Sequence, residues 1–263
     1  MAGLEGRVAL VSGGGRGIGA AICLALARDG ADVAINYRRD EDAAREVQRE
    51  VEALGRRARL YQAEVSDWEA DQRMVEAVAG ELGPVDILVN NAGIASRGQF
   101  VADTDPAEME RVVRTHVFGA FYLSKLVLPG MRTRPRGDII MISSSASQGL
   151  GAGGAPYNMA KTAMEALAKT LAKEERDNGI RVNVVAPGLV ETEMGRRLIR
   201  ATAGVQDLAA HAPNMPFGMV CQPEDIGAMV AFLCGEGGRY ITHQVIYVNG
   251  GGFESPRRAQ ARA

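Results

Sequence analysis

Short apolar runs recur along the chain and alternate with longer amphipathic stretches. The apolar runs lie at residues 7–11, 32–35, 59–63, 85–89, 138–142, 181–185 and 245–248. Helical periodicity is found at residues 18–29, 40–54, 67–81, 106–129 and 156–178. Runs that are apolar throughout are typical of parallel strands buried on both faces, and right-handed crossovers wind such strands into a doubly wound sheet. The sequence therefore predicts an α/β fold with a seven-stranded parallel sheet and helices on both faces.

No linker, repeat or shift in composition divides the 263 residues, so we expect 1–263 to form a single domain. One segment, 189–221, departs from the alternation and mixes Gly, Pro, His and Met residues. A long irregular insertion after a strand is often functional, and we expect this segment to be a substrate lid. The basic end of the chain, 253–263, is expected to be a flexible tail.

The charge balance argues against some classes of partner. The chain has 30 basic and 32 acidic residues, and its net charge is −2. A chain of this kind has no basic surface for nucleic acid or an anionic membrane, so we expect neither partner. The three cysteines lie far apart without the spacing of metal ligands, and no apolar run is long enough to span a bilayer. We therefore predict a cytoplasmic protein without a metal site.

A glycine-rich turn joins the first predicted strand to the first predicted helix. Its glycines let the backbone bend tightly and approach a ligand, and the following helix N-terminus offers free N–H groups and a partial positive charge. This strand–turn–helix context favours a diphosphate-binding site over a tight turn without a ligand. The predicted contacts are Ser12, Gly13, Arg16, Gly17, Ile18 and Gly19.

Four further motifs occupy the ends of predicted elements. In chain order they are Asn91-Ala92-Gly93, Tyr157-x-x-x-Lys161, Pro187-Gly188-x-x-x-Thr192 and Val248-Asn-Gly-Gly251. Together with the glycine turn, in which Ser12 replaces a Thr, they resemble the short-chain dehydrogenase/reductase family over about residues 5–252. The resemblance implies a Rossmann fold and an oxidoreductase that moves a hydride between a nicotinamide and a carbonyl or secondary alcohol carbon.

Tyr157 and Lys161 are four residues apart on a predicted helix and therefore share one face. A free tyrosine has a pKa near ~10, and a neighbouring ammonium favours the phenolate, so we expect Lys161 to lower the pKa of Tyr157. Tyr157 would then act as the general acid and base. The resemblance gives Ser144 the hydrogen bond to the substrate oxygen, with Ser143, Ser145 and Ser147 as rivals that turn chemistry also explains.

His116 stands where the family often has an Asn that supports a proton relay to the lysine. Three interpretations stay open. The backbone carbonyl could serve the relay alone, the imidazole could replace the amide and add a pH dependence near its usual pKa of ~6.5, or the relay could be impaired. The second interpretation predicts that His116→Asn changes the pH–rate profile.

The second predicted strand ends in Tyr37 and Arg38, where an NAD-binding member would carry a carboxylate for the ribose 2′-hydroxyl. A guanidinium binds a 2′-phosphate instead, and Arg16 can approach the same group. We therefore predict NADP(H), with NAD(H) as the less favoured cofactor. The resemblance implies further cofactor contacts from Tyr37, Arg38, Glu64, Val65, Asn91, Ala92, Gly93, Tyr157, Lys161, Pro187, Gly188, Val190 and Thr192.

The chain is most similar to the 3-oxoacyl-[acyl-carrier-protein] reductase-like branch, which implies a ketoreductase acting on a small-molecule or acyl-thioester carbonyl. Two alternatives remain: an NAD(H)-dependent alcohol, sugar or steroid dehydrogenase, and a non-catalytic cofactor-sensing binding protein. The resemblance also implies a homotetramer. Side chains that could line the substrate or pack the lid are Met194, Leu198, Ile199, His211, Met215, Phe217 and Met219, and basic residues that could meet an acidic carrier protein are Arg97, Arg132, Arg134 and Arg136.

Overall fold

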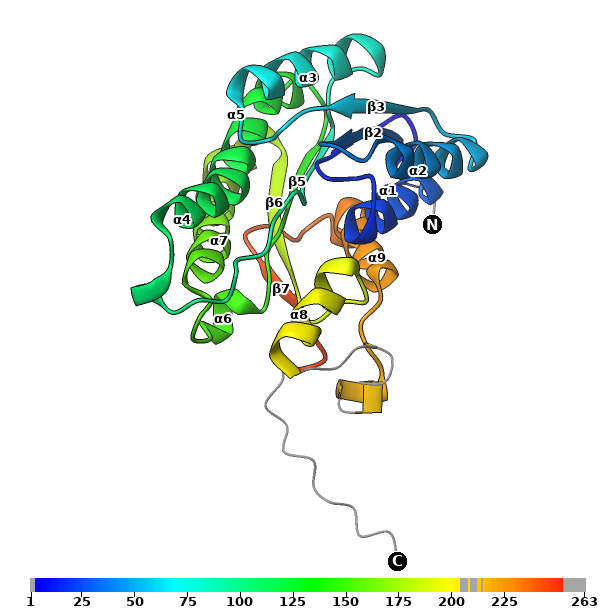
Figure 1. The fold of residues 1–263 in the computed structure, drawn as a ribbon. Coiled ribbons are helices and arrows are strands. Elements are labelled where there is room, and N and C mark those ends of the chain that lie inside the picture. Colours follow the sequence, from blue (N-terminus) through cyan, green and yellow to red (C-terminus); the bar gives the residue numbers. More distant parts are fainter. Residues whose placement is uncertain (1–2, 204–207, 209–211, 214, 253–263) are drawn as a thin grey trace, which may run out of the picture.

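The computed structural model describes residues 3–203, 208, 212–213 and 215–252. Its centre is a sheet of seven parallel strands in the order β3-β2-β1-β4-β5-β6-β7, covered by helices on both faces (Figure 1). This confirms the predicted doubly wound fold. The strands are β1 (Val8–Val11), β2 (Asp32–Tyr37), β3 (Ala58–Gln62), β4 (Ile87–Asn90), β5 (Gly137–Ile142), β6 (Ile180–Pro187) and β7 (Val245–Val248).

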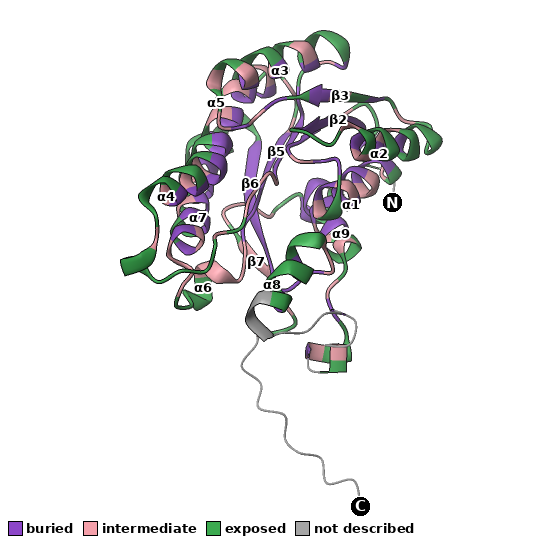
Figure 2. Ribbon diagram, viewed as in Figure 1, coloured by how far each residue is buried: buried purple, intermediate pink, exposed green. Residues whose placement is uncertain are grey.

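Strand β1 explains why the apolar runs have no polar face. Ala9 and Val11 pack into one core with the helices on one face of the sheet, whereas Val8 and Leu10 pack into a second core with the helices on the other face. Successive strand residues point to opposite sides, so both sets must be apolar. Figure 2 shows this burial along the central strands.

Most helices lie where periodicity places them. The longer helices are α1 (Gly17–Arg28), α2 (Glu41–Ala53), α3 (Trp68–Glu81), α4 (Pro106–Val113), α5 (Gly119–Met131), α7 (Ala155–Glu175), α8 (Glu193–Ala203) and α9 (Pro223–Cys234). The sequence did not predict α9, which packs against α1. None of the helices in the described part of the chain is long and apolar enough to cross a membrane.

The predicted helix at 106–129 is interrupted by a π-helical turn, Arg114–Phe118, between α4 and α5. A π turn inserts an extra residue into the helix and often lies at a functional site. Here it carries His116, which is 1% exposed, toward the ends of the central strands. Gly119, just after it, approaches Val65 so closely that a Cβ would lie 2.8 Å from the Val65 carbonyl oxygen.

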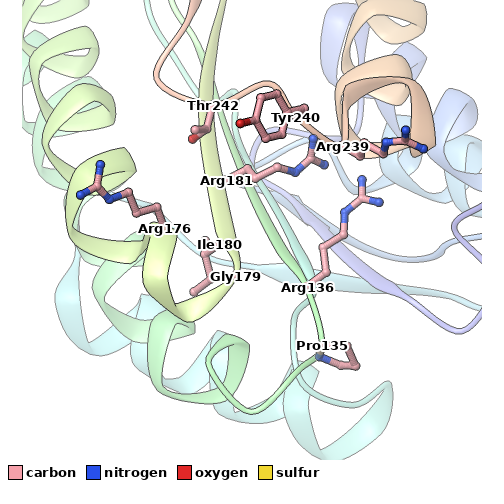
Figure 3. A pocket seen from close by; sticks show the side chains of 9 residues that line it. All are labelled: Pro135, Arg136, Arg176, Gly179, Ile180, Arg181, Arg239, Tyr240 and Thr242. Atoms are coloured by element: carbon pink, nitrogen blue, oxygen red, sulfur yellow. The ribbon is translucent and has the colours of Figure 1, made fainter.

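A cluster of charges lies at the amino-terminal ends of the strands, away from the glycine turn. Asp138 at the start of β5 is 1% exposed and pairs with Arg7 at 2.8 Å, with Arg136 at 3.4 Å and with Arg181. Arg136 and Arg181 line a hollow of about 530 Å³, in which their guanidinium groups point toward one another (Figure 3). A single buried carboxylate thus joins three cations contributed by three segments of the chain.

Three of the four arginines considered for binding an acidic carrier protein lie at the same end of the strands as this charge cluster. Arg132, Arg134 and Arg136 lie between α5 and β5, at the end of the strands opposite the glycine turn. Each of the four arginines of that set pairs with a carboxylate: Arg97 with Glu108, Arg132 with Glu175, Arg134 with Asp86 and Arg136 with Asp138. Their charges are therefore largely satisfied within the chain.

Candidate active site

The carboxyl ends of β1 and β4 meet where the strand order reverses direction, which is where open α/β sheets bind ligands. Ser12 locks these two ends together. Its Oγ accepts hydrogen bonds from the Asn91 N–H at 2.9 Å and the Ala92 N–H at 3.0 Å. The Asn91 amide donates in return to the carbonyls of Ser12 at 2.9 Å and Gly13 at 3.1 Å. The structure thus brings two sequence-predicted motifs into one rigid unit.

The glycine turn has the backbone shape that a diphosphate needs. Gly13 and Gly17 have φ of 62° and 55°, which glycine adopts without strain. A Cβ on Gly19 would lie 2.2 Å from the Gly13 carbonyl oxygen, so α1 packs directly on the turn. The Arg16 side chain does not cap α1, and the first N–H groups of α1 remain available to an anion. These residues fit a dinucleotide diphosphate.

Asn36 holds the turn and was not among the predicted site residues. It is 2% exposed, and its Oδ1 accepts a hydrogen bond from the Gly13 N–H at 3.1 Å. Its Nδ2 donates to the carbonyls of Tyr61 and Ala63. A polar residue within an apolar strand is the sequence signal that could have identified it.

Tyr157, Lys161 and Ser144 come together as the sequence predicted. Tyr157 lies in the first turn of α7, and the Ser144 hydroxyl hydrogen-bonds its hydroxyl. The Lys161 ammonium lies 5.5 Å from the centre of the Tyr157 ring and donates to the Ile142 carbonyl at 2.7 Å. The half-buried Tyr157 and Ser144 and the buried Lys161 thus form one polar group beside the strand ends.

The rival serines have other partners. Ser143 and Ser147 both approach the carboxylate of Glu165, and the Ser145 Oγ is buried without a hydrogen-bond partner in the described part of the chain. Of the four serines, Ser144 is the one that the structure places on Tyr157.

The pKa values of the pair differ from the sequence-based expectation. Burial raises the pKa of the Tyr157 hydroxyl, and the hydrogen bond with Ser144 opposes this rise. Burial also lowers the pKa of the Lys161 ammonium to about 7, which the charge of Glu165 opposes. The expected lowering of the Tyr157 pKa therefore does not occur here, because desolvation outweighs the hydrogen bond with Ser144. A neutral tyrosine hydroxyl suits proton donation.

His116 binds the loop after β4. Its Nε2 lies 2.8 Å from the Ile94 carbonyl oxygen and 3.1 Å from the Ile94 nitrogen, so either tautomer bonds this backbone. The imidazole stands edge-on to the Tyr157 ring at 5.5 Å. A Cβ on Gly93 would lie 2.5 Å from His116 Cε1. The His116 side chain therefore lies between Gly93 and Tyr157 and fixes the loop after β4.

We expect His116→Asn to leave the pH dependence of turnover unchanged between about pH 5 and 9. Burial and the nearby Lys161 lower the pKa of the imidazole to about 3, so it stays neutral across that range. The measurement is kcat/KM of both proteins against pH. A limb near pH 6.5 in the wild type that disappears in the variant would instead support the titrating relay.

The two arginines predicted to bind the ribose 2′-phosphate each form an ion pair within the chain. Arg38 forms a 2.8 Å ion pair with Glu64, and Arg16 forms a 2.9 Å pair with Glu193 of α8. Tyr37 is buried. Arg38 and Glu64 line a hollow of about 340 Å³ together with Arg111 and Arg114, neither of which was predicted. They come from α4 and the π turn, so only the fold reveals them.

The segment after β6 lies beside the glycine turn. The Gly188 N–H donates to the Val248 carbonyl at 3.0 Å, and Val190 forms a bridge with Cys221. The Thr192 Oγ1 accepts a hydrogen bond from the Gly195 N–H at 3.0 Å. A Cβ on Gly17 would lie 3.5 Å from Thr192 Cγ2. The Pro187–Thr192 motif and the glycine turn therefore border the same space.

The segment 189–221 has an apolar cluster of its own. Ile199 and Met215 are buried in it with Leu189, Leu208 and Val220. Met194, Leu198, Phe217 and Met219 are exposed, Phe217 to 89%. Ile199 and Met215 therefore pack the segment itself. The exposed side chains are Met194, Leu198, Phe217 and Met219. His211 and the tail at 253–263 lie outside the described residues.

Comparisons with known proteins agree with this geometry. A family model described as enoyl-(acyl carrier protein) reductase matches residues 13–252. Acetoacetyl-CoA reductase of Shinella zoogloeoides is 38% identical over 247 residues, which cover 94% of this chain and 98% of that one. The 3-oxoacyl-[acyl-carrier-protein] reductase FabG of Vibrio cholerae is 37% identical over 248 residues and covers the same shares.

Solved structures of dehydrogenases are also similar to this chain. A short-chain dehydrogenase from Burkholderia cenocepacia in complex with NADP matches with a TM-score of 0.84 at 34% identity, covering 94% of this chain and 98% of that chain. A 7α-hydroxysteroid dehydrogenase complexed with NADH and a 7-oxo bile acid matches with a TM-score of 0.87 at 30% identity, covering 96% of each chain.

Proposed function

The chain belongs to the short-chain dehydrogenase/reductase family, and from that premise we propose that it is an NADP(H)-dependent ketoreductase acting on 3-oxoacyl thioesters. The observation that carries the proposal is that Ser144, Tyr157 and Lys161 lie together beside an uncapped, glycine-bounded helix N-terminus. The relatives named acetoacetyl-CoA reductase and 3-oxoacyl-[acyl-carrier-protein] reductase support the substrate class.

A reduction suits the protonation states of the site. A bound nicotinamide cofactor would supply the hydride to the carbonyl carbon. Ser144 donates a hydrogen bond to the carbonyl oxygen, and Tyr157 gives that oxygen its proton as the alcohol forms. Because burial favours the neutral tyrosine, the proton is in place when the hydride arrives. Lys161, held by the Ile142 carbonyl, stabilises the tyrosinate that remains.

We assign the cofactor preference to Arg38. The net charge around the hollow supports a 2′-phosphate, since Arg38, Arg111 and Arg114 outnumber Glu64 and Glu110 there. The cofactor phosphate would replace Glu64 as the partner of the Arg38 guanidinium.

We expect Arg38→Ala to raise the KM for NADPH by about 10- to 100-fold, because a charge-assisted hydrogen bond contributes about 1.5–3 kcal/mol. The KM for NADH, which lacks the phosphate, should change little. The measurement is steady-state kinetics with both cofactors, and Arg39→Ala on the neighbouring exposed residue is the control. Equal weakening of NADPH and NADH would contradict the assignment.

A homotetramer in the cytoplasm completes the proposal. Phe118, Phe121 and Met159 expose apolar surface on the π turn, α5 and α7, and each is more than 40% exposed in the single chain. Burying such side chains in a subunit interface is favourable. A molar mass of four chains in light scattering is the expected result, whereas a monomer would contradict it.

The substrate class is tested by an NADPH-coupled screen. The panel contains acetoacetyl-CoA, the unsaturated crotonyl-CoA, a cyclic ketone and a 7-oxosteroid. We expect the highest kcat/KM with acetoacetyl-CoA. A preference for crotonyl-CoA would indicate enoyl reduction, and a preference for the steroid with NADH would favour the alternative dehydrogenase.

A further inference from the structure

Glu165 is a buried carboxylate that the proposed reaction does not use. It lies on α7 one helical turn beyond Lys161 and is 8% exposed. Its Oε1 accepts a hydrogen bond from the Ser143 Oγ at 2.7 Å and lies 2.5 Å from the Ser147 Oγ. A carboxylate is costly to bury unless it is hydrogen-bonded, and the two serine hydroxyls supply that compensation here.

The two serines flank Ser144. The Ser143 N–H is fixed to β6 through the Val185 carbonyl, and the Ser147 Oγ also lies 2.8 Å from the Ser144 carbonyl oxygen. The short helix α6 (Ala146–Gly149) continues this segment and packs against α7 (Figure 1). Glu165 therefore joins the segment that carries Ser144 to the helix that carries Tyr157 and Lys161.

Glu165 also acts on Lys161 through its charge. Lys161 is 3% exposed, and burial brings the pKa of its ammonium down to about 7, whereas the Glu165 charge raises it. The other groups facing Lys161 are the Tyr157 ring and His116, which the low pKa of its imidazole keeps neutral. Among the described residues, Glu165 is thus the anion whose charge favours the ammonium form of Lys161.

We propose that Glu165 is a positioning residue that fixes Ser144 against Tyr157 and maintains the positive charge of Lys161. The proposal rests on the proposed function, because it assigns Glu165 a role in the same site. Ser147 completes the arrangement, because its hydroxyl lies against both the Glu165 carboxylate and the Ser144 carbonyl oxygen.

The test compares Glu165→Gln, Glu165→Ala and, as the matched control, Glu174→Gln on the exposed face of the same helix. Hydrogen exchange is measured at the amides of Ser147, Gly149 and Leu150, which bond within the segment. We expect at least tenfold faster exchange in Glu165→Ala and unchanged exchange in the Gln variants, because a glutamine oxygen still accepts from the serines. Unchanged exchange in Glu165→Ala would overturn the positioning role.

The charge is tested by the pH profile of NADPH-dependent reduction. Turnover should fall as pH rises through the pKa of Lys161, because only the ammonium supports Tyr157. Losing the opposite charge lowers that pKa, so Glu165→Gln should move the alkaline limb down by about one pH unit with little change in KM. A limb that stays in place would overturn the charge role. A wild type without reductase activity would refute the proposed function, and the exchange rates would still decide the role of Glu165.

Discussion

Tyr157→Phe is expected to lower kcat for carbonyl reduction by about 10²- to 10⁴-fold, the usual contribution of a general acid. The variant removes the hydroxyl that the Ser144 hydrogen bond reaches, and it keeps the ring whose centre lies 5.5 Å from the Lys161 ammonium. The KM for the carbonyl substrate and the affinity for NADPH should change far less, since the substitution leaves the glycine turn and the loop after β6 unchanged. The measurement is steady-state turnover with acetoacetyl-CoA, together with NADPH binding followed by fluorescence.

Tyr122→Phe is the matched control. Tyr122 lies on α5 and packs edge-on against Trp68, Phe118 and Phe121, in an aromatic group separate from the Ser144–Tyr157–Lys161 contact. Its loss of a hydroxyl should leave kcat near that of the wild type. If Tyr157→Phe kept a tenth or more of the wild-type kcat, proton donation would have to come from another group.

Asp138→Asn is expected to lower the free energy of unfolding by about 3–5 kcal/mol, the usual cost of removing one partner from a buried ion pair. The carboxylate pairs with Arg7, Arg136 and Arg181, and the side chains of Arg7 and Arg181 are themselves only 12% and 10% exposed. The neutral amide would leave three guanidinium groups together without their anion. Chemical denaturation at neutral pH measures the change.

Glu46→Gln gives the comparison for an exposed charge. Glu46 pairs with Arg49 on the solvent face of α2, and both side chains are more than 60% exposed. Such pairs contribute about 0–1 kcal/mol, so this variant should remain close to the wild type. A change below about 1 kcal/mol in Asp138→Asn would show that the three arginines do not depend on this carboxylate.

The fold was predictable because its signals are local and repeated. Fully apolar runs such as residues 139–142 can lie only within a covered sheet, and the glycines at 13, 17 and 19 allow a turn that few other residues permit. The contact between Tyr157 and Lys161 follows from helical spacing, and the place of Ser144 follows from the family resemblance. The roles of these residues in binding and catalysis stay predictions.

The rest depends on contacts between distant segments. The π turn that carries His116 has no local sequence signal, and α9 was missed within a stretch of Gly, Ala and apolar residues. Arg111 and Arg114 join Arg38 only because α4 and the π turn line the same hollow as the segments that follow β2 and β3. The raised pKa of Tyr157 arises from burial, which spacing along a helix does not reveal.

The most direct test of the account is the initial rate of NADPH oxidation by the purified protein with acetoacetyl-CoA. We predict 3-hydroxybutyryl-CoA as the product, a kcat/KM at least tenfold higher with NADPH than with NADH, and loss of this activity in Tyr157→Phe. Tight NADPH binding without oxidation across the whole carbonyl panel would contradict the account and would instead identify a cofactor-sensing binding protein.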